Sequence, residues 1–501
     1  MTLKIYNSLS RKIENFKPIE EGKVKMYVCG MTVYSDAHIG HARTYFAFDL
    51  IRRYLEYKNY KVSYVQNITD VDDKIINAAK KEGIDALEYS KRFTDRCLKD
   101  LDRLGIRRAD LYPKASDTIP DMIKMTQNII RKGFAYVSKG DVYFSVEKFK
   151  DYGKLSGQKI DDMKVGARIE PGEQKQNPLD FTLWKKAKSG DPSWDSPWGK
   201  GRPGWHIECS TMSGKFLGIP FDIHGGGMDL RFPHHENEIA QAEAATGKDF
   251  AKYWIHIGLL TINGEKMSKS IGNIINIKDL LKSWDPEVIR FFFAQAHYRS
   301  PPDFNEKALQ NAQKGLERIY RLKEKLERIS SNTTVKEINK KTLDDEDKKF
   351  LETIIDFIIQ FEKSMDDDFN TPVAVSVIFD FVNKSNKYIE ENPIPNKQLC
   401  GYALFKLKEL GHILTLFQPR LEEKKGPDNR DLFRKLTRII MKYDKEAKIE
   451  NVDNVLDLLL ELREKARKKK DYKTSDGIRK DLEDIGFEIQ DTSHGHVWRK
   501  R

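Results

Sequence analysis

The feature that most constrains this chain is a strand, a glycine turn, a long helix and a second strand in direct succession. Residues 24–28 are β-rich and alternate, Cys29-Gly30 interrupts them, and apolar residues recur at helical spacing from Ala42 to Tyr57 before a second β-rich run at 62–65. Two strands joined by one helix of this length predict a parallel pair with a right-handed crossover. Ligands bind such a sheet at the carboxyl ends of its strands, where Cys29 and Thr69-Asp70 are expected.

The rest of the chain divides into a sheet-forming part and a helical part. Further strands are expected at 221–224 and 253–257, each running into a loop that contains glycine. The region 115–205 is helical and then rich in Gly, Pro and Trp, as an insertion in the sheet would be. After about residue 300 apolar residues recur at helical spacing, and a charged segment at 422–427 indicates a domain linker. The sequence therefore predicts an α/β part followed by helical domains.

Composition narrows the class of protein. The chain of 501 residues is several domains long, and its 39% hydrophobic and 33% charged residues are typical of a globular protein. No run approaches the roughly 20 apolar residues of a membrane helix, and the first residues do not resemble a signal peptide, so we expect a cytoplasmic protein that has no membrane partner. The net charge of +11 favours a polyanionic partner such as nucleic acid, although dispersed lysines also serve solubility.

Two short motifs carry residues suited to binding phosphates. His38-Ile39-Gly40-His41 opens the helix after the first strand, where unpaired backbone N–H groups attract anions and Gly40 lets a ligand approach the backbone. Alone this motif is weak, because isolated histidines are usually structural. Lys266-Met267-Ser268-Lys269-Ser270 follows the last strand and places two lysines and two hydroxyls on one loop, which suits transferring phosphates or, more simply, a charged surface loop.

In this order and separation, the two motifs resemble the nucleotide-binding signatures of class I aminoacyl-tRNA synthetases. The resemblance implies a Rossmann-type catalytic domain in which His38, Gly40, His41, Lys266 and Lys269 grip ATP, carried with Mg²⁺, from two sides. It also implies the reaction: an amino acid carboxylate attacks the α-phosphate, pyrophosphate leaves, and the aminoacyl group moves to the terminal ribose of tRNA. Such catalysis works by positioning and by stabilising phosphoryl charge, a role suited to the two histidines and two lysines.

A third set of residues has the chemistry of a metal site. Cys29 ends the first strand, Cys209 follows a Gly-Trp-His segment, and His234 and Glu238 stand at i and i+4 behind a proline that fits the first turn of a helix. Two thiolates, an imidazole and a carboxylate make a good zinc shell. Spacing alone leaves the assignment open, because buried cysteines are usually inert and because the neighbouring His235-Glu236 pair competes for it.

Several longer segments are similar to the cysteinyl-tRNA synthetase family. They are residues 31–37, 67–75, 201–209, 222–238 and 365–372. The similarity covers nearly the whole chain, and the one departure is Met228, where a small residue is common. The resemblance implies that Cys29, Cys209, His234 and Glu238 bind one Zn²⁺, and that the zinc binds the thiolate of L-cysteine.

A zinc–thiolate contact provides a way to tell cysteine from serine. The two amino acids differ by one atom, sulfur in place of oxygen, which packing discriminates poorly. A metal that prefers soft ligands, such as zinc, favours thiolate over hydroxyl. We therefore predict no separate editing domain, and the region 115–205 is too short and too rich in loops for one. With substrate bound, either the zinc becomes five-coordinate or one ligand such as Glu238 loosens, and the sequence leaves both possibilities open.

The resemblance also implies roles around the pocket. Gly225–Gly227 would let adenosine approach the end of a strand, with Asp229 beside them, the alternative being a simple turn. Thr69, Trp205 and His224 are expected to line the amino acid pocket, although a tryptophan beside a cysteine is often a core residue.

The remaining thiols and carboxylates receive structural assignments. Cys97 and Cys400 are expected to pack in helical cores. Asp72, Asp73 and the carboxylates of 366–368 suggest a magnesium site at first sight, but helix capping and solvated loops are the expected roles.

The resulting domain plan has three parts. Residues 1–300 form the Rossmann-type catalytic domain, with a connective insertion at 115–205 and the lysine loop and stem contact at 265–305. Residues 306–420 form a helical bundle that binds the anticodon stem of tRNA(Cys), and residues 428–501 form a small basic domain that recognises the anticodon. The family resemblance suggests a monomer.

Two other functions compete with cysteine–tRNA ligation. A ligase that passes zinc-bound cysteine to a small amine, as in mycothiol synthesis, resembles only the front part of the chain and lacks such a tail. A non-catalytic RNA-binding or zinc-structural relative would have no use for Lys266 and Lys269. The basic residues between Lys465 and Lys473, with Trp498 for base stacking, favour a protein that binds RNA.

Overall fold

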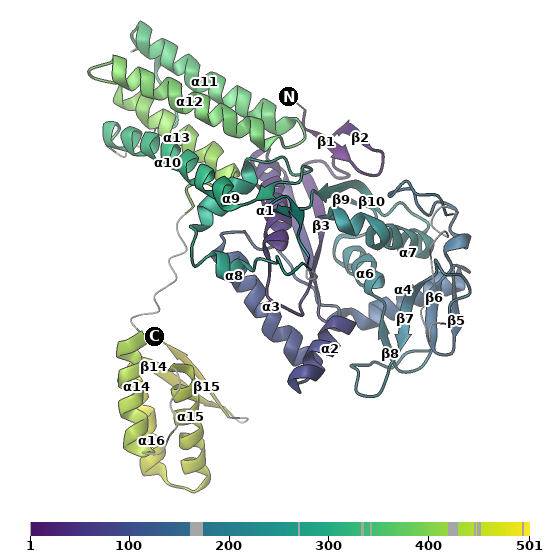
Figure 1. The fold of residues 1–501 in the computed structure, drawn as a ribbon. Helices are drawn as coiled ribbons and strands as arrows, with labels where there is room; N and C mark the ends of the chain where they lie inside the picture. Colours follow the sequence, from purple (N-terminus) through teal and green to yellow (C-terminus); the bar gives the residue numbers. More distant parts are fainter. Residues whose placement is uncertain are drawn as a thin grey trace. The chain divides into compact units, whose positions relative to one another are not determined.

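The computed structural model describes residues 2–160, 174–268, 271–331, 335–340, 343–418, 429–444, 447, 452–492 and 495–500. The chain forms two compact units, which divide between Gln418 and Pro419 (Figure 1). Within the described ranges, every helix is too short or too polar to cross a membrane.

A four-stranded parallel sheet lies at the centre of the first unit. Its spatial order is β10-β9-β3-β4, and every neighbouring pair is parallel. The strands are β3 (Lys23–Thr32), β4 (Lys61–Thr69), β9 (Phe221–Gly227) and β10 (Ala251–Ile257). The predicted α/β fold with a parallel sheet is therefore confirmed.

The order of the strands creates a point where the chain changes direction across the sheet. Helix α1 (Ile39–Tyr57) joins β3 to β4 on one side, and α7 (Glu236–Thr246) lies between β9 and β10 on the other. The strand order therefore reverses between β3 and β9. In open α/β sheets, ligands bind in the crevice outside the carboxyl ends of the strands at such a reversal.

The alternation along β3 sends its side chains into two different cores. Met26 and Val28 belong to the core that includes the buried residues of α1. Tyr27 and Cys29 belong to the core on the opposite face, which includes residues of α6 (Trp205–Leu217). Because both faces are covered, the strand is apolar throughout its middle, as buried parallel strands are.

The expectation that Cys29 ends the first strand is wrong. Strand β3 continues to Thr32, with an irregular register against β4 between Val28 and Met31. A Cβ on Gly30 would lie 1.6 Å from the carbonyl oxygen of Asn67, so only glycine fits there. The glycine allows the two backbones to approach closely rather than ending the strand.

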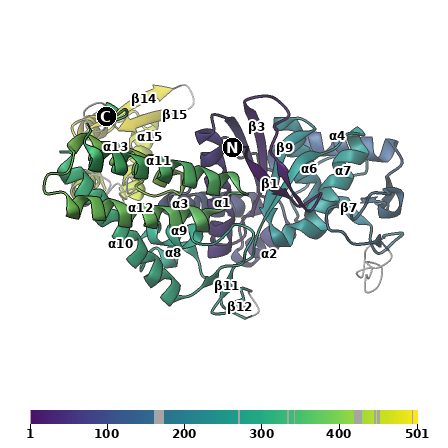
Figure 2. The same ribbon diagram turned by 90° about the horizontal axis from the view of Figure 1, so that it is seen from above.

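The insertion contains a second sheet that the sequence did not predict. After α4 (Ile119–Arg131), an antiparallel sheet has the order β5-β6-β7-β8. Its strands are β5 (Ala135–Ser138), β6 (Asp141–Phe144), β7 (Phe181–Lys186) and β8 (Gly201–Pro203). These strands have three to six residues, too few to give a clear alternation. In both views the insertion and the helical bundle lie on opposite sides of the parallel sheet (Figures 1 and 2).

The rest of the first unit consists of short elements around the sheet and the helical bundle. The short elements are β1 (Lys4–Asn7), β2 (Lys12–Asn15), α2 (Asp73–Glu82), α3 (Ala86–Arg103), β11 (Thr261–Ile262), β12 (Glu265–Lys266), α8 (Ile277–Leu280), α9 (Pro286–Ala294) and β13 (Asp303–Phe304). The bundle comprises α10 (Glu306–Ile329), α11 (Asp345–Asp366), α12 (Thr371–Glu391) and α13 (Lys397–Ile413). Its apolar stripes face inward, as Leu316, Leu322 and Ile354 illustrate.

Two aspartates at the corner between α11 and α12 attach the bundle to the sheet part. Asp366 accepts hydrogen bonds from the Tyr54 hydroxyl of α1 (2.7 Å) and from Lys58 (3.3 Å), the residue that follows α1. Asp368 accepts from the Tyr298 hydroxyl (2.6 Å) and from Arg299 Nε (2.8 Å). Both carboxylates are buried, so the expectation of solvated loops is wrong for them. Buried carboxylates need such partners, because an unpaired buried charge is strongly destabilising.

Other structural assignments agree with the coordinates. The Asp72 carboxylate caps α2 by accepting from the Lys74 backbone N–H, while Asp73 forms ion pairs with Arg202 and Lys185. Cys97 is buried, as expected for a packing residue.

The second unit is a small helical domain with a hairpin. It contains α14 (Asn429–Tyr443), α15 (Val452–Lys468) and α16 (Tyr472–Glu483), followed by the antiparallel strands β14 (Phe487–Thr492) and β15 (Gly495–Lys500). Its separate core includes Leu436, Leu459 and Ile478.

Candidate active site and metal centre

Four side chains predicted as metal ligands come together at the reversal of the sheet. One potential ligand atom from each of Cys29, Cys209, His234 and Glu238 lies within 4.8 Å of all the others. The two Sγ atoms are 3.7 Å apart, and the Cys29 Sγ lies 3.3 Å from Glu238 Oε1. All four side chains are buried.

Each of the four comes from a different element. Cys29 lies on β3, Cys209 in the second turn of α6, and Glu238 in the first turn of α7. His234 lies in a π-helical turn at Arg231–His235 that precedes α7. Because the carboxyl ends of β3 and β9 lie side by side, residues far apart in the sequence meet at this edge.

The carboxylate of Glu238 is the centre of the group. Its Oε2 lies 2.8 Å from His224 Nε2, and its Oε1 lies 3.0 Å from His234 Nε2. Burial opposes ionisation of Glu238. The two histidines attract its negative charge and form hydrogen bonds with it, and together they hold the pKa of Glu238 well below its usual range. Glu238 is therefore an anion in the protein core.

The partners of Glu238 respond to this charge. Burial opposes protonation of His234, yet Glu238 and Cys209 raise the pKa of His234 to about 10. Burial raises the pKa of the Cys29 thiol well above its usual value. Burial has the same tendency at Cys209, but hydrogen bonds from Cys29 and His234 lower the pKa of Cys209. An imidazolium at His234 therefore lies between a carboxylate and a thiolate, and a metal cation could take the place of its proton.

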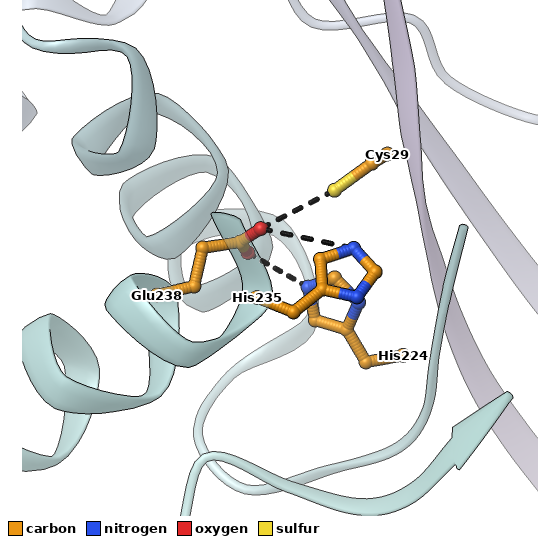
Figure 3. A group of neighbouring side chains, drawn as sticks. All are labelled: Cys29, His224, His235 and Glu238. Carbon is orange, nitrogen blue, oxygen red and sulfur yellow. Dashed lines mark hydrogen bonds and ion pairs between the residues drawn. The ribbon is translucent and has the colours of Figure 1, made fainter. Parts of the chain in front are cut away.

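A second arrangement of ligands shares two of these residues. Cys29, His224, His235 and Glu238 also bring one ligand atom each within 4.8 Å of one another. Figure 3 shows Cys29, His224 and His235 around the Glu238 carboxylate. No described group forms a hydrogen bond to His235 Nε2. The ring is held from its other side by His256, whose Nε2 lies 2.9 Å from His235 Nδ1.

The number of sulfur donors favours the arrangement with both cysteines. It contains two sulfur atoms, and zinc in proteins prefers thiolate and imidazole donors. The ring of His234 is also oriented from behind, since its Nδ1 lies 2.7 Å from Nδ1 of His206. Such outer contacts fix the orientation of metal-binding histidines.

The competing candidate Glu236 has a different role. Its carboxylate accepts hydrogen bonds from the backbone N–H groups of Gly153 (3.0 Å), Leu155 (3.4 Å) and Ser156 (2.7 Å). It thereby anchors the 153–156 turn to the start of α7 and is not among the clustered ligand atoms.

The first phosphate motif forms the start of α1. His38 is the N-cap of the helix, and its backbone N–H lies 3.3 Å from His41 Nδ1. The two rings stack, with centroids 3.7 Å apart and planes inclined by 17°. Both histidines are half-buried at the amino end of the helix, where the positive end of the helix dipole attracts anions.

The structure brings the second phosphate motif against the first. Backbone hydrogen bonds run from Ile39 to Ile275 and from Ile277 to Ala37, both 2.9 Å long. A Cβ on Gly40 would lie 2.9 Å from the Met267 methyl group, so the loop covers the motif closely. Lys266, in β12, is exposed. Lys269, the other predicted phosphate ligand, lies outside the described residues.

The glycines predicted to contact adenosine form the carboxyl half of β9 rather than a turn. A Cβ on Gly225 would lie 2.2 Å from the ring of Phe48, and one on Gly226 would lie 2.9 Å from His235. A Cβ on Gly227 would meet the carboxylate of the exposed Asp229 at 2.4 Å. Packing therefore requires glycine at 225 and 226, whereas the neighbour of Gly227 is the end of an exposed side chain that can move.

Two of the three predicted pocket residues contact Cys29, Cys209, His234 and Glu238, the four proposed ligands that we call the metal group. The ring of Trp205 is 40% exposed and lies 4.3 Å from that of His234, centroid to centroid. His224 contacts Glu238, as described above. Thr69 donates a hydrogen bond of 2.8 Å to Glu208, a buried carboxylate that sequence reasoning missed. Its position in 201–209, immediately before Cys209, was the available signal.

His206 and His256 were also missed as site residues. His256 is buried and His206 is half-buried; desolvation lowers the pKa of His206 well below its usual value and the pKa of His256 to about 3. They are therefore neutral near pH 7 and orient His234 and His235 through single ring nitrogens.

Comparison with known proteins identifies two domains in the chain. Residues 15–314 match the family model described as the class I (C) tRNA synthetase catalytic domain, and residues 360–418 match a DALR domain. The first match spans the sheet, the insertion, both phosphate motifs and the metal group.

Curated relatives match over the full length. A cysteine–tRNA ligase of Thermococcus gammatolerans is 47% identical over 500 residues, covering 100% of this chain and 99% of the relative. One from Thermodesulfovibrio yellowstonii is 47% identical, covering 99% of each chain. One from Clostridioides difficile is 46% identical, covering 99% of this chain and 100% of the relative.

Solved structures agree on the fold. The methionyl-tRNA synthetase of Mycobacterium tuberculosis in complex with methionyl-adenylate superposes with a TM-score of 0.59 at 15% identity, covering 82% of this chain and 94% of that one. The LeuRS of Agrobacterium radiobacter, in a ternary complex with tRNA, has a TM-score of 0.60 at 12% identity, covering 82% and 86%. With this fold and full-length identity to such relatives, the chain belongs to the cysteine–tRNA ligase family of class I aminoacyl-tRNA synthetases.

Proposed function

We propose that this protein activates L-cysteine with ATP to cysteinyl-adenylate and transfers it to the 3′-terminal ribose of tRNA(Cys), using Zn²⁺ to select the substrate thiol. The observation that carries the proposal is the convergence of Cys29, Cys209, His234 and Glu238 beside the His38–His41 motif. A soft-donor metal group next to an anion site suits a substrate with both a thiol and a reacting phosphate.

The donor set fits zinc. Two sulfurs, an imidazole nitrogen and a carboxylate oxygen stand close together, and their chemistry matches the ligands that zinc takes in proteins. When bound, zinc would lower the pKa of a substrate thiol and favour thiolate over the hydroxyl of serine. The protein contributes the fixed positions of these donors and a site closed to water.

Binding of ATP is assigned to the two docked motifs. The positive amino end of α1 and the stacked rings of His38 and His41 would face the phosphates. Lys266 would approach from β12, and Lys269 from the residues after it. These cations act by stabilising the charge that develops on the phosphates as pyrophosphate leaves. Mg²⁺ would arrive with ATP.

The nucleoside and the amino acid are assigned to neighbouring strand ends. Adenosine would lie against Gly225–Gly227 and Asp229, where β9 has no side chains on its backbone. Thr69, Trp205 and His224 would enclose the cysteine between the metal group and the α-phosphate. Half-exposed Trp205 is suited to covering the entrance.

Recognition of tRNA is assigned to the rest of the chain. We expect the bundle of 306–420 to contact the anticodon stem and the basic domain of 428–501 to recognise the anticodon. Lys469, Lys470 and Lys473 are exposed, and none of them is ion-paired with a described residue. Unpaired lysines at one end of a domain are suited to phosphate contacts. We expect the enzyme to act as a monomer.

Three assays on the purified full-length protein test the proposal. Pyrophosphate exchange should depend on L-cysteine and not on L-serine, and metal analysis should find one zinc per chain. A transcript with the GCA anticodon should be charged with cysteine, which a ligase acting on a small amine would fail to do. Absence of cysteine-dependent exchange would overturn the proposed activity.

A further inference from the structure

The carboxylate of Glu208 is buried without a full set of partners. Glu208 is 1% exposed, and its Oε2 accepts the hydrogen bond from Thr69. No described group forms a hydrogen bond to its Oε1. Its ionisable neighbours Cys209, Asp70 and Asp72 are acidic and, together with burial, oppose a negative charge on it. A buried carboxylate of this kind is costly until a donor or cation reaches it.

The position of Glu208 on its helix directs it toward the amino acid pocket. Trp205, Glu208 and Cys209 stand at i, i+3 and i+4 on α6 and therefore share one face of that helix. Cys209 belongs to the metal group, and Trp205 contacts His234 of the same group. The shared face is thus the one that borders the bound amino acid in the proposed function.

A chain of hydrogen bonds fixes the carboxylate in place. Asn67 accepts a hydrogen bond from the Gly30 N–H (2.7 Å) and donates one to the Thr69 hydroxyl (3.2 Å), which in turn donates to Glu208. The network joins β3, β4 and α6, so one oxygen of Glu208 is held while the other is left available.

We propose that Glu208 binds the α-ammonium group of the substrate cysteine through Oε1, with Thr69 orienting the carboxylate. The inference rests on the proposed function. Only two carbon atoms separate the sulfur and the ammonium nitrogen of cysteine. A substrate whose sulfur lies at the metal group therefore carries its positive charge close to Cys209 and its neighbour Glu208. The ammonium would supply a donor to Oε1 and a positive charge among these acidic neighbours.

The other buried carboxylate of this region gives a matched control. Glu236 is also 1% exposed and two residues from a proposed ligand, but backbone N–H groups donate to both of its oxygens. Replacing either glutamate with glutamine keeps the size of the side chain and turns one carboxyl oxygen beside the metal group into an amide nitrogen. Only Glu208 should affect recognition of an ammonium group.

The experiment compares two thiol ligands that differ by that group alone. L-Cysteine and 3-mercaptopropionate are titrated calorimetrically into the zinc-loaded wild type, Glu208→Gln and Glu236→Gln, with zinc content measured in each. Glu208→Gln should weaken L-cysteine binding by about 10- to 100-fold and change 3-mercaptopropionate by less than about twofold. Glu236→Gln should leave the ratio between the two ligands unchanged.

Two results would overturn the proposal: an equal loss for both ligands in Glu208→Gln, or no loss for either. If Glu208→Gln loses zinc, Thr69→Val decides by the same comparison, since it releases the oriented carboxylate without removing it. Pyrophosphate exchange by the wild type separates the two levels of inference. No exchange with L-cysteine contradicts the proposed function, whereas normal exchange with an unchanged ligand ratio contradicts only the role of Glu208.

Discussion

The metal group and the lysine loop are built in opposite ways. Cys29, Cys209, His234 and Glu238 are at most 4% exposed and come from elements packed on the sheet. Lys266 is exposed at the end of the two-residue strand β12, beyond a turn in which Gly264 has φ of +82°. The proposed metal ligands are thus fixed in the core before substrate arrives, whereas the lysine proposed to contact the phosphates lies on the surface.

The difference follows from the task of each region. Choosing between a thiol and a hydroxyl requires donors at fixed positions, and positions are fixed best by packed strands and helices. Stabilising a leaving pyrophosphate requires cations that approach only after ATP has bound, and an exposed loop allows this approach without disturbing the core. Mutations in the two regions should therefore impair different steps: binding of the amino acid in the first and catalysis at the phosphates in the second.

The largest effect is expected from Cys209→Ser. Loss of one thiolate should cost on the order of 4 kcal/mol of zinc affinity, or about 1,000-fold, and cysteine-dependent pyrophosphate exchange should fall with it. Zinc content and exchange are measured on the same preparation. Cys97→Ser, in a buried cysteine far from the group, is the control and should retain zinc. A Cys209→Ser protein with one zinc per chain and normal exchange would contradict the assignment.

Lys266→Ala tests the role of the exposed lysine loop. Removing a cation that acts only as charge develops should lower kcat of exchange by roughly 100- to 1,000-fold and leave the Kd of L-cysteine unchanged. The matched control is Lys314→Ala, an exposed lysine on α10. Weaker cysteine binding with unchanged kcat would show that the lysine serves the amino acid rather than the phosphates.

Removal of the second unit extends the comparison beyond the active site. A chain ending at Gln418, the boundary of the first unit, should retain zinc and cysteine-dependent exchange. Its kcat/KM for charging tRNA(Cys) should fall by roughly 100-fold, because the tRNA loses one of two linked binding surfaces. Equal charging by the shortened and full chains would refute the proposed role of 428–501.

A smaller effect distinguishes the two arrangements of ligands. His206→Asn should weaken zinc binding by about 10- to 100-fold, since the contact with His234 Nδ1 is lost. His235→Asn should weaken it by less, because His235 is outside the proposed set. Competition with a chelator of known affinity measures both. A greater loss in His235→Asn would favour the arrangement of Cys29, His224, His235 and Glu238.

The parts of the fold that could be predicted are those with a local pattern. The strand, helix and strand between residues 23 and 69 have clear periods, and the histidine motif has a fixed place at the start of its helix. The antiparallel sheet of the insertion could not be predicted, because strands of three to six residues show too little alternation.

The parts that could not be predicted depend on distant partners. Asp368 is buried because the backbone N–H of Tyr6, 362 positions earlier, donates to it (2.8 Å). The role of Glu208 likewise depends on Thr69, which lies 139 positions earlier. The set of Cys29, Cys209, His234 and Glu238 came from the family resemblance. The residue types and their spacing alone did not decide between His234 and His235.

The central claim is that a metal held by two protein thiolates binds the thiolate of the substrate. Replacement of zinc by Co²⁺ makes this visible, because each cobalt–thiolate bond contributes to a charge-transfer absorption in the near ultraviolet. Titration of the cobalt enzyme with L-cysteine should increase this band, and L-serine at the same concentration should leave it unchanged. A band that responds to neither amino acid, or equally to both, would contradict the account.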